Sequence, residues 1–255
     1  MEKSVAPSST LQMSNAFLLR YRTVYNSLQD VETAYDTLLA RKDRLKVIRE
    51  ALRILKKHKT NEYTGIFLLH RHFDCKARTI FVERSYKPES EGHRALFITT
   101  AEPIENSPKR MAPFRFKISK KGDLQPLEFT TDTAAIKSFA SFSNAGAMHR
   151  ELGAYFEDKG LSDLLGVGIH SRSRAIEETT LVFVEETRFD DLASLTHLVN
   201  HVPAQIRRSI PTHWTLRATT RNGCCTYNCV AYCTNHANPG SGYCGHRKEN
   251  HVGCV

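Results

Sequence analysis

A cluster of cysteines and histidines near the end of the chain constrains the fold more than any other sequence feature. Six of the seven cysteines lie between Cys224 and Cys254, and three histidines lie among them. The same segment has few apolar side chains that could form a core of their own. A small segment of this kind needs disulfides or a bound metal to hold it together. We therefore expect a small, stapled unit in this part of the chain.

The choice between disulfides and metal depends on the compartment. Residues 1–17 contain no continuous apolar run of the kind found in secretory signals, which predicts a cytoplasmic or nuclear protein with reduced thiols. A metal is then favoured over a disulfide-stapled or disordered tail, and zinc accepts mixed thiolate and imidazole ligands. Three of the cysteines are spaced four residues apart and would share one face of a helix. The candidate ligands are Cys225, Cys229, Cys233, His236, Cys244, His246 and His251.

Helical periodicity is clearest in the first quarter of the chain. Leu45, Ile48, Leu52 and Leu55 recur at intervals of three and four residues, within a pattern that predicts a long helix over 30–59. After residue 61 the sequence pattern changes to short runs rich in branched and aromatic residues, and polar residues separate these runs. The runs that we expect to be strands are 63–70, 78–84, 93–99, 114–118, a second hairpin arm to 129, 179–185 and 212–219.

These elements predict an α+β fold, with an antiparallel or mixed sheet, a long N-terminal helix and a small Cys/His-rich metal-binding appendage. Further helices are expected over 133–159, ending at Gly160, and over 190–199. The Asn222-Gly223 turn signal marks a domain boundary. The predicted domains are a flexible tail (1–14), the α+β domain (15–221) and the zinc-binding segment (222–255).

A second group of polar residues lies at the end of the first predicted strand. Alternation along that strand would put His70 and His72 on one face of the sheet, and Glu83 on the next strand could face the same pocket. Imidazoles and a carboxylate are common tools of acid–base catalysis and common metal ligands. Histidines at a strand end also serve as plain hydrogen-bonding groups, so both readings stay open. If the C-terminal segment folds back onto this strand, the two groups become one site in which zinc activates water or a carbonyl.

The charge of the chain suggests a different class of function. The formal net charge is +9, and much of the excess lies in 41–59 and 109–121. A basic helix could follow the phosphates of RNA or tRNA, although such charge runs are usually just solvated faces. No apolar run is long enough to span a membrane. The sequence also lacks the glycine-rich phosphate loops and the G-x-S-x-G elbow of familiar enzymes.

Two short stretches support a resemblance. The string Leu68–Phe73 (LLHRHF) is similar to one found in a group of small, uncharacterised fungal proteins, and the Cys244, His246 and His251 ending resembles theirs. The resemblance implies a fungal protein, with a role in specialised metabolism. The sequence thus leaves three hypotheses: a zinc-binding, metal-dependent enzyme, a basic protein that binds RNA or uses tRNA, and a non-catalytic interaction protein with a zinc-stapled tail.

Overall fold

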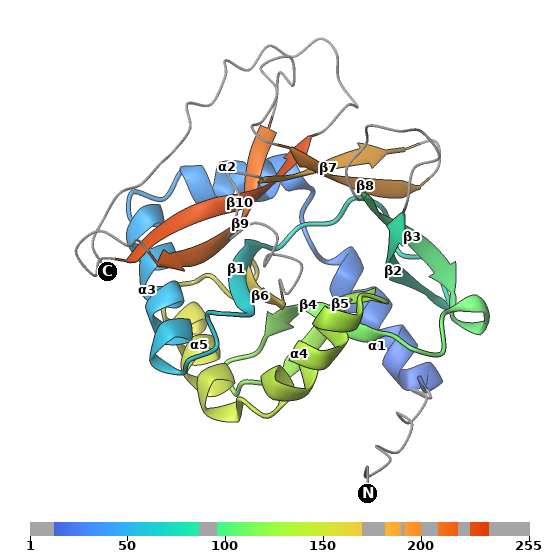
Figure 1. Cartoon of the computed structure of the whole chain (residues 1–255), viewed down its shortest axis with the longest axis horizontal. Coiled ribbons are helices and arrows are strands. Elements are labelled where there is room, and N and C mark those ends of the chain that lie inside the picture. The colour runs from blue at the N-terminus through green and yellow to red at the C-terminus, as the bar shows by residue number, and fades with distance from the viewer. Residues whose placement is uncertain are drawn as a thin grey trace, which may run out of the picture.

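The fold of the chain is a closed β-barrel. In the computed structural model, the described residues are 13–86, 96–169, 182–189, 192–199, 209–218 and 225–234. Within these residues, ten strands pair in the order β1-β6-β4-β5-β2-β3-β8-β7-β10-β9. Pairing of β9 with β1 closes the barrel (Figure 1). The strands are β1 (Thr64–Leu68), β2 (Thr79–Tyr86), β3 (Leu96–Pro103), β4 (Ala112–Ile118), β5 (Leu124–Thr130), β6 (Leu165–Ile169), β7 (Val182–Arg188), β8 (Ala193–Val199), β9 (Ser209–Ala218) and β10 (Cys225–Thr234).

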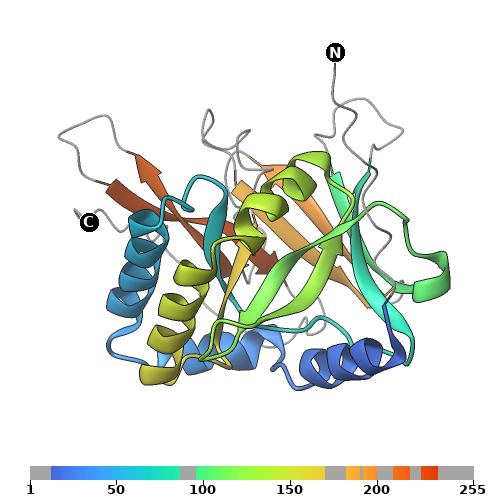
Figure 2. The ribbon, with the colours of Figure 1, turned by 90° about the horizontal axis from the view of Figure 1, so that it is seen from below.

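Most neighbouring strands are antiparallel, and the exceptions are β2 with β5 and β7 with β10. Helices cover part of the outer surface: α1 (Asn15–Asn26), α2 (Val31–Leu39), α3 (Arg44–Lys57), α4 (Thr133–Ser143) and α5 (Gly146–Asp158), with a 3-10 turn at Ile104–Asn106. Figure 2 shows α3, α4 and α5 on one side of the barrel, with α1 and α2 running along its lower edge. None of the described helices has the length and apolar character needed to cross a lipid bilayer.

The prediction of an α+β fold, with an antiparallel or mixed sheet and one long N-terminal helix, is wrong. The helical pattern over 30–59 is divided between α2 and α3, which are separated by a turn at residues 40–43. The sheet closes on itself, because β9 and β10 pair with β1 and β7. The predicted metal-binding appendage is also corrected, since its residues 225–234 form β10, a strand of the barrel wall. The region expected to be a helix at 190–199 contains β8 instead.

The apolar stripe of α3 packs as its periodicity indicates. Ile48, Leu52 and Leu55 are buried in a core shared with α2, α4, α5 and the outer faces of β1, β4 and β6. Gly160 has a φ of 61° directly after the end of α5, which confirms the predicted helix stop. The predicted hairpin is likewise confirmed as β4 and β5, and its turn contains Gly122 at a φ of 88°. Local signals were therefore reliable on this side of the molecule.

A second core forms where α1 lies against β2 and β5. The Tyr21 hydroxyl donates to the carbonyl oxygen of Leu127 (2.6 Å) and accepts from the backbone N–H of Phe81 (3.1 Å). Tyr25 stacks on the Phe81 ring, with 4.4 Å between the ring centroids. One helix is thus joined to both strands of a parallel pair.

The inner face of the barrel is polar on several neighbouring strands. Across β7 and β8, Glu185 pairs with Thr196, and across β7 and β10 it pairs with Cys233. On the opposite wall, Arg115 of β4 pairs with Glu128 of β5. Residues paired across strands point to the same face of a sheet. All five are buried, so the closed sheet encloses a group of ionisable and polar side chains.

Candidate metal centre

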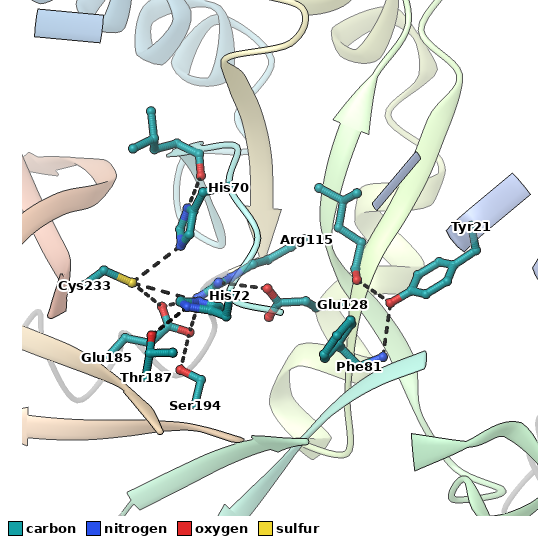
Figure 3. Close-up of polar contacts among 12 residues, drawn as sticks. Tyr21, His70, His72, Phe81, Arg115, Glu128, Glu185, Thr187, Ser194 and Cys233 are labelled. Carbon is teal, nitrogen blue, oxygen red and sulfur yellow. Dashed lines mark hydrogen bonds and ion pairs between the residues drawn. The ribbon is translucent and has the colours of Figure 1, made fainter. Parts of the chain in front are cut away.

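Four potential metal ligands meet inside the barrel. One ligand atom each from His70, His72, Glu185 and Cys233 lies within 4.8 Å of the others (Figure 3). The sulfur of Cys233 lies 3.5 Å from Nε2 of His70, 4.0 Å from Nε2 of His72 and 3.5 Å from Oε2 of Glu185. The side chains of His72 and Glu185 are only 5% and 3% exposed. This buried group could hold a metal ion.

The two histidines lie in the segment that follows β1. The strand was expected to place both histidines on one face of the sheet, which is wrong: β1 ends at Leu68, and His70 and His72 lie in the loop that follows. Between them, Arg71 points away: its backbone N–H donates to the carbonyl of Gln29 and its guanidinium to that of Asn26. These bonds hold Arg71 against the connection between α1 and α2. Both imidazoles therefore lie on the other side of the loop, where their ring centroids are 4.8 Å apart.

The orientation of His70 suits metal binding. Its Nδ1–H donates to the carbonyl oxygen of Leu68 (2.8 Å), because a carbonyl can only accept. This bond leaves the lone pair of Nε2 directed at Cys233. Burial, together with the nearby His72, lowers the pKa of His70 to about 3. The imidazole is therefore neutral at physiological pH, as a metal ligand must be.

His72 is held by a neighbour on β7. Its Nδ1 forms a hydrogen bond with the hydroxyl of Thr187 (2.9 Å), and its Nε2 lies 3.3 Å from Oε1 of Glu185. Ligating histidines usually bond a second group through the nitrogen that does not face the metal, and this contact fixes the ring. Thr187 is well placed for that role, since it lies two residues from Glu185 on the same strand face.

Glu185 enters the barrel from β7 and contacts two donors on other strands. Its Oε1 accepts from the Ser194 hydroxyl (3.1 Å), and its Oε2 accepts from Nη2 of Arg115 (3.3 Å). Burial alone would raise the pKa of Glu185, but the charge of Arg115 and the contact with His72 hold it well below its usual value. The carboxylate is therefore ionised in the folded protein, which is the form that binds a metal.

Cys233 comes from β10, next to irregular pairing with β9 at residues 229–232. Burial raises the pKa of its thiol well above the usual value, and the adjacent Glu185 raises it further. Without a cation, the thiol is therefore protonated. A bound metal would reverse this by replacing the thiol proton.

Arg115 links the four donors to a further carboxylate. Its Nη1 donates to Oε1 of Glu128 (3.1 Å), and its guanidinium lies 5.4 Å from the Phe114 ring centroid and 5.8 Å from that of Phe67. Burial alone would lower the pKa of Arg115, but Glu128 and Glu185 raise it, so the group is permanently charged. A buried guanidinium of this kind fixes both the position and the charge of Glu185.

The structure brings together some of the predicted site residues and separates others. His70, His72 and Cys233 meet, as expected if the C-terminal segment folds back onto the histidines. Glu83 is buried on β2, where its Oε1 accepts from the Thr130 hydroxyl (3.0 Å), outside the four-residue group. Cys225 begins β10, and its side chain is not described. The remaining predicted ligands, His236, Cys244, His246 and His251, lie outside the described residues.

Cys229 lies on the same strand as Cys233 but has a different environment. Its thiol donates to the carbonyl oxygen of Ala231 (3.1 Å), and burial raises its pKa to about 12. The expectation that the cysteines share a helix face is wrong, because β10 is a strand whose pairing is irregular between Cys229 and Tyr232.

Sequence reasoning missed Glu185 as a ligand and Arg115 as its partner. The sequence predicted Glu185 only as the last residue of the strand 179–185, and Arg115 only as a residue of the strand 114–118. Arg115 could have been identified by alternation, because the residues on either side of it in β4 are apolar. Glu185 has no comparable local signal, since Glu186 and Arg188 follow it in β7.

A cysteine nucleophile is a weaker interpretation of the same group. A nucleophilic thiol needs a lowered pKa, and here burial and Glu185 raise that of Cys233. Cys75, which follows the histidines in sequence, is buried beside Thr79, and burial raises its thiol pKa as well. The donors are therefore better suited to a metal than to covalent catalysis.

The basic helix is partly neutralised by its neighbours. In and before α3, Lys57 pairs with Glu151 (2.8 Å), Arg53 with Glu50, and Arg41 with Asp43 (3.1 Å). Binding of RNA or another anionic partner stays a prediction.

Comparisons with known proteins identify no relative. No protein-family model matches the chain, and neither curated proteins nor solved structures match it. The resemblance to fungal proteins therefore stays a prediction, and the proposal below rests on geometry.

Proposed function

We propose that this chain is a zinc-binding protein whose zinc is held inside the barrel by His70, His72, Glu185 and Cys233. The observation that carries the proposal is the spacing of the four donors. Tetrahedral zinc with bonds of about 2.05 Å to nitrogen or oxygen and about 2.3 Å to sulfur separates its donors by about 3.3–3.6 Å.

Three of the separations agree with that geometry. The sulfur of Cys233 lies 3.5 Å from His70 and 3.5 Å from Glu185, and His72 lies 3.3 Å from Glu185. The sulfur lies 4.0 Å from His72, and the four donor atoms as a set lie within 4.8 Å of one another. Zinc binding would therefore draw the donors closer together.

Charge supports the same proposal. Among the described residues, the carboxylates of Glu185 and Glu128 face the single guanidinium of Arg115. Buried charges are costly unless they are paired. A divalent cation that also removes the thiol proton of Cys233 would add a net charge of +1, which offsets the excess of buried carboxylates (Glu83, Glu128 and Glu185) over this guanidinium.

Zinc fits this donor set better than other common ions. Magnesium and calcium prefer oxygen ligands, whereas two imidazoles and a thiolate suit a borderline-soft ion. The zinc would join the loop after β1 to β7 and β10, which are far apart in sequence.

The test is metal content, measured by plasma mass spectrometry on protein purified without added metal. We expect zinc in the wild-type protein and the loss of about one equivalent per chain in Cys233→Ser, because a serine hydroxyl is a much weaker zinc ligand than a thiolate.

Cys229→Ser is the matched control, since it changes the same residue type on the same strand outside the donor group. It should retain all the zinc. Equal zinc content in wild type and Cys233→Ser, with both proteins folded, would refute the proposal.

A further inference from the structure

We propose that Glu185 is an exchangeable ligand of this centre, which a small anionic oxygen donor such as a substrate carboxylate replaces on the zinc. The inference rests on the proposed function and adds a reactive position to it. It starts from an asymmetry among the four donors. The histidines bond outside groups through the nitrogen that faces away from the metal position, whereas both potential metal-binding oxygens of Glu185 bond groups outside the set.

Both oxygens of Glu185 have such an outside partner. Oε2 accepts from Arg115 of β4, and Oε1 accepts from Ser194 of β8 (Figure 3). None of the four donors found among the described residues comes from β4 or β8. If the carboxylate moved off the metal, these two donors would still satisfy it.

The other donors are arranged as permanent ligands. His70 and His72 use their Nδ1 atoms to bond Leu68 and Thr187, which directs each Nε2 at the metal position. The hydrogen-bond contacts that described residues make with the sulfur of Cys233 come only from the other three donors. A thiolate released from zinc would be a buried anion beside Glu185, which is unfavourable.

Charge identifies the class of the incoming ligand. Zinc, one thiolate and one carboxylate sum to zero. Without Glu185, the zinc and the Cys233 thiolate together keep a charge of +1, which favours an anion at the vacated position. A carboxylate oxygen has the charge and donor type of the group that it replaces. The zinc would then act as a Lewis acid on the bound molecule.

Cobalt substitution tests this exchange, because Co²⁺ occupies zinc sites and its visible spectrum reports on coordination. We would load the wild-type protein with Co²⁺ and titrate it with acetate and, separately, with azide. We expect a saturable change in the visible bands with each anion. Co²⁺-loaded Cys233→Ser should not show the wild-type spectrum, which places the signal at this centre.

Glu185→Ala shows whether an anion reaches the metal when no internal carboxylate competes. We expect it to bind azide at least about tenfold more tightly than wild type, since exchange no longer has to displace Glu185. If neither anion changes the visible spectrum of the Co²⁺-loaded wild type, Glu185 is a permanent ligand and the inference is wrong. This holds whether or not the spectrum of Glu185→Ala responds to azide. Failure of the wild type to bind Co²⁺ or zinc would instead refute the proposed function.

Discussion

At the scale of single residues, buried polar side chains determine what the barrel interior can bind. Thr187 and Thr196 lie on facing strands close to Glu185, and both are buried. The Thr187 hydroxyl bonds His72, whereas the Thr196 hydroxyl has no hydrogen-bond partner among the described residues. The two threonines are therefore a matched pair for testing the support of a metal ligand.

We expect Thr187→Val to weaken zinc binding by about 10–100-fold, the usual effect of removing a group that orients a ligating histidine. Competition with a chromogenic chelator measures the dissociation constant. Thr196→Val is the control and should bind zinc like wild type. Equal affinities of the two variants would show that Thr187 does not orient His72.

His149 gives a pH-dependent prediction away from the metal centre. It is buried on α5 against the Phe142 ring, and burial lowers its pKa below the usual value of about 6.5. As the pH falls below about 6.5, the unfolded chain binds a proton that the folded chain binds only at lower pH. The free energy of unfolding must therefore decrease on acidification.

We expect His149→Gln to reduce this decrease, because glutamine does not titrate. Urea unfolding at pH 7.5 and pH 5.5 measures the effect in both proteins. Identical pH dependence in the two would show that His149 keeps its ordinary pKa after folding.

Residue patterns predicted the histidines and Cys233 but not the complete set of donors. His70 and His72 are separated by one residue and so were identified as a pair, and Cys233 belongs to the cluster of cysteines between Cys224 and Cys254. Glu185 is one of two adjacent acids, and nothing local distinguishes it from Glu186. What selects Glu185 is the inward-facing register of β7, which is set by pairing with β8 and β10.

At the scale of elements, a strongly periodic helix such as α3 was easy to predict, whereas α1 was not predicted. The stripe on α3 is a local pattern, and the structure buries Leu52 completely. β6 was not predicted, because its sequence is LGVGI and glycine is rare in strands. The structure gives the reason: a Cβ on Gly166 would lie 2.4 Å from the carbonyl oxygen of Phe116, so the close approach to β4 requires glycine.

β8 was predicted as a helix for a related reason. Its buried positions include Ser194 and Thr196, so the side that faces the interior is polar. Hydrophobicity patterns assume that the buried face is apolar, and a barrel that encloses polar groups breaks this assumption.

The packing of α3 gives a stability prediction. Leu52→Ala should lower the free energy of unfolding by about 2–5 kcal/mol, because the Leu52 side chain is fully buried and its removal leaves a cavity in the core. Lys46→Ala, on the exposed face of the same helix, should change it by less than about 0.5 kcal/mol. Urea denaturation measures both, and similar effects would mean that the helix is oriented differently on the barrel.

At the scale of the whole molecule, closure of the sheet creates the site. The four donors come from residues 70 to 233, and the barrel brings them together by pairing β7 with β10 and β9 with β1. Pairings between strands so far apart in sequence leave no local signal. For this reason the sequence favoured two separate groups of ligands, in a histidine strand and in a C-terminal appendage.

Zinc-edge X-ray absorption on the purified zinc protein tests the central claim most directly, since it reports the donor atoms around the metal. We expect one sulfur at about 2.3 Å and three nitrogen or oxygen donors at about 2.0–2.2 Å, as His70, His72, Glu185 and Cys233 would provide. A shell dominated by sulfur would contradict this assignment. It would place the zinc among other cysteines of the chain.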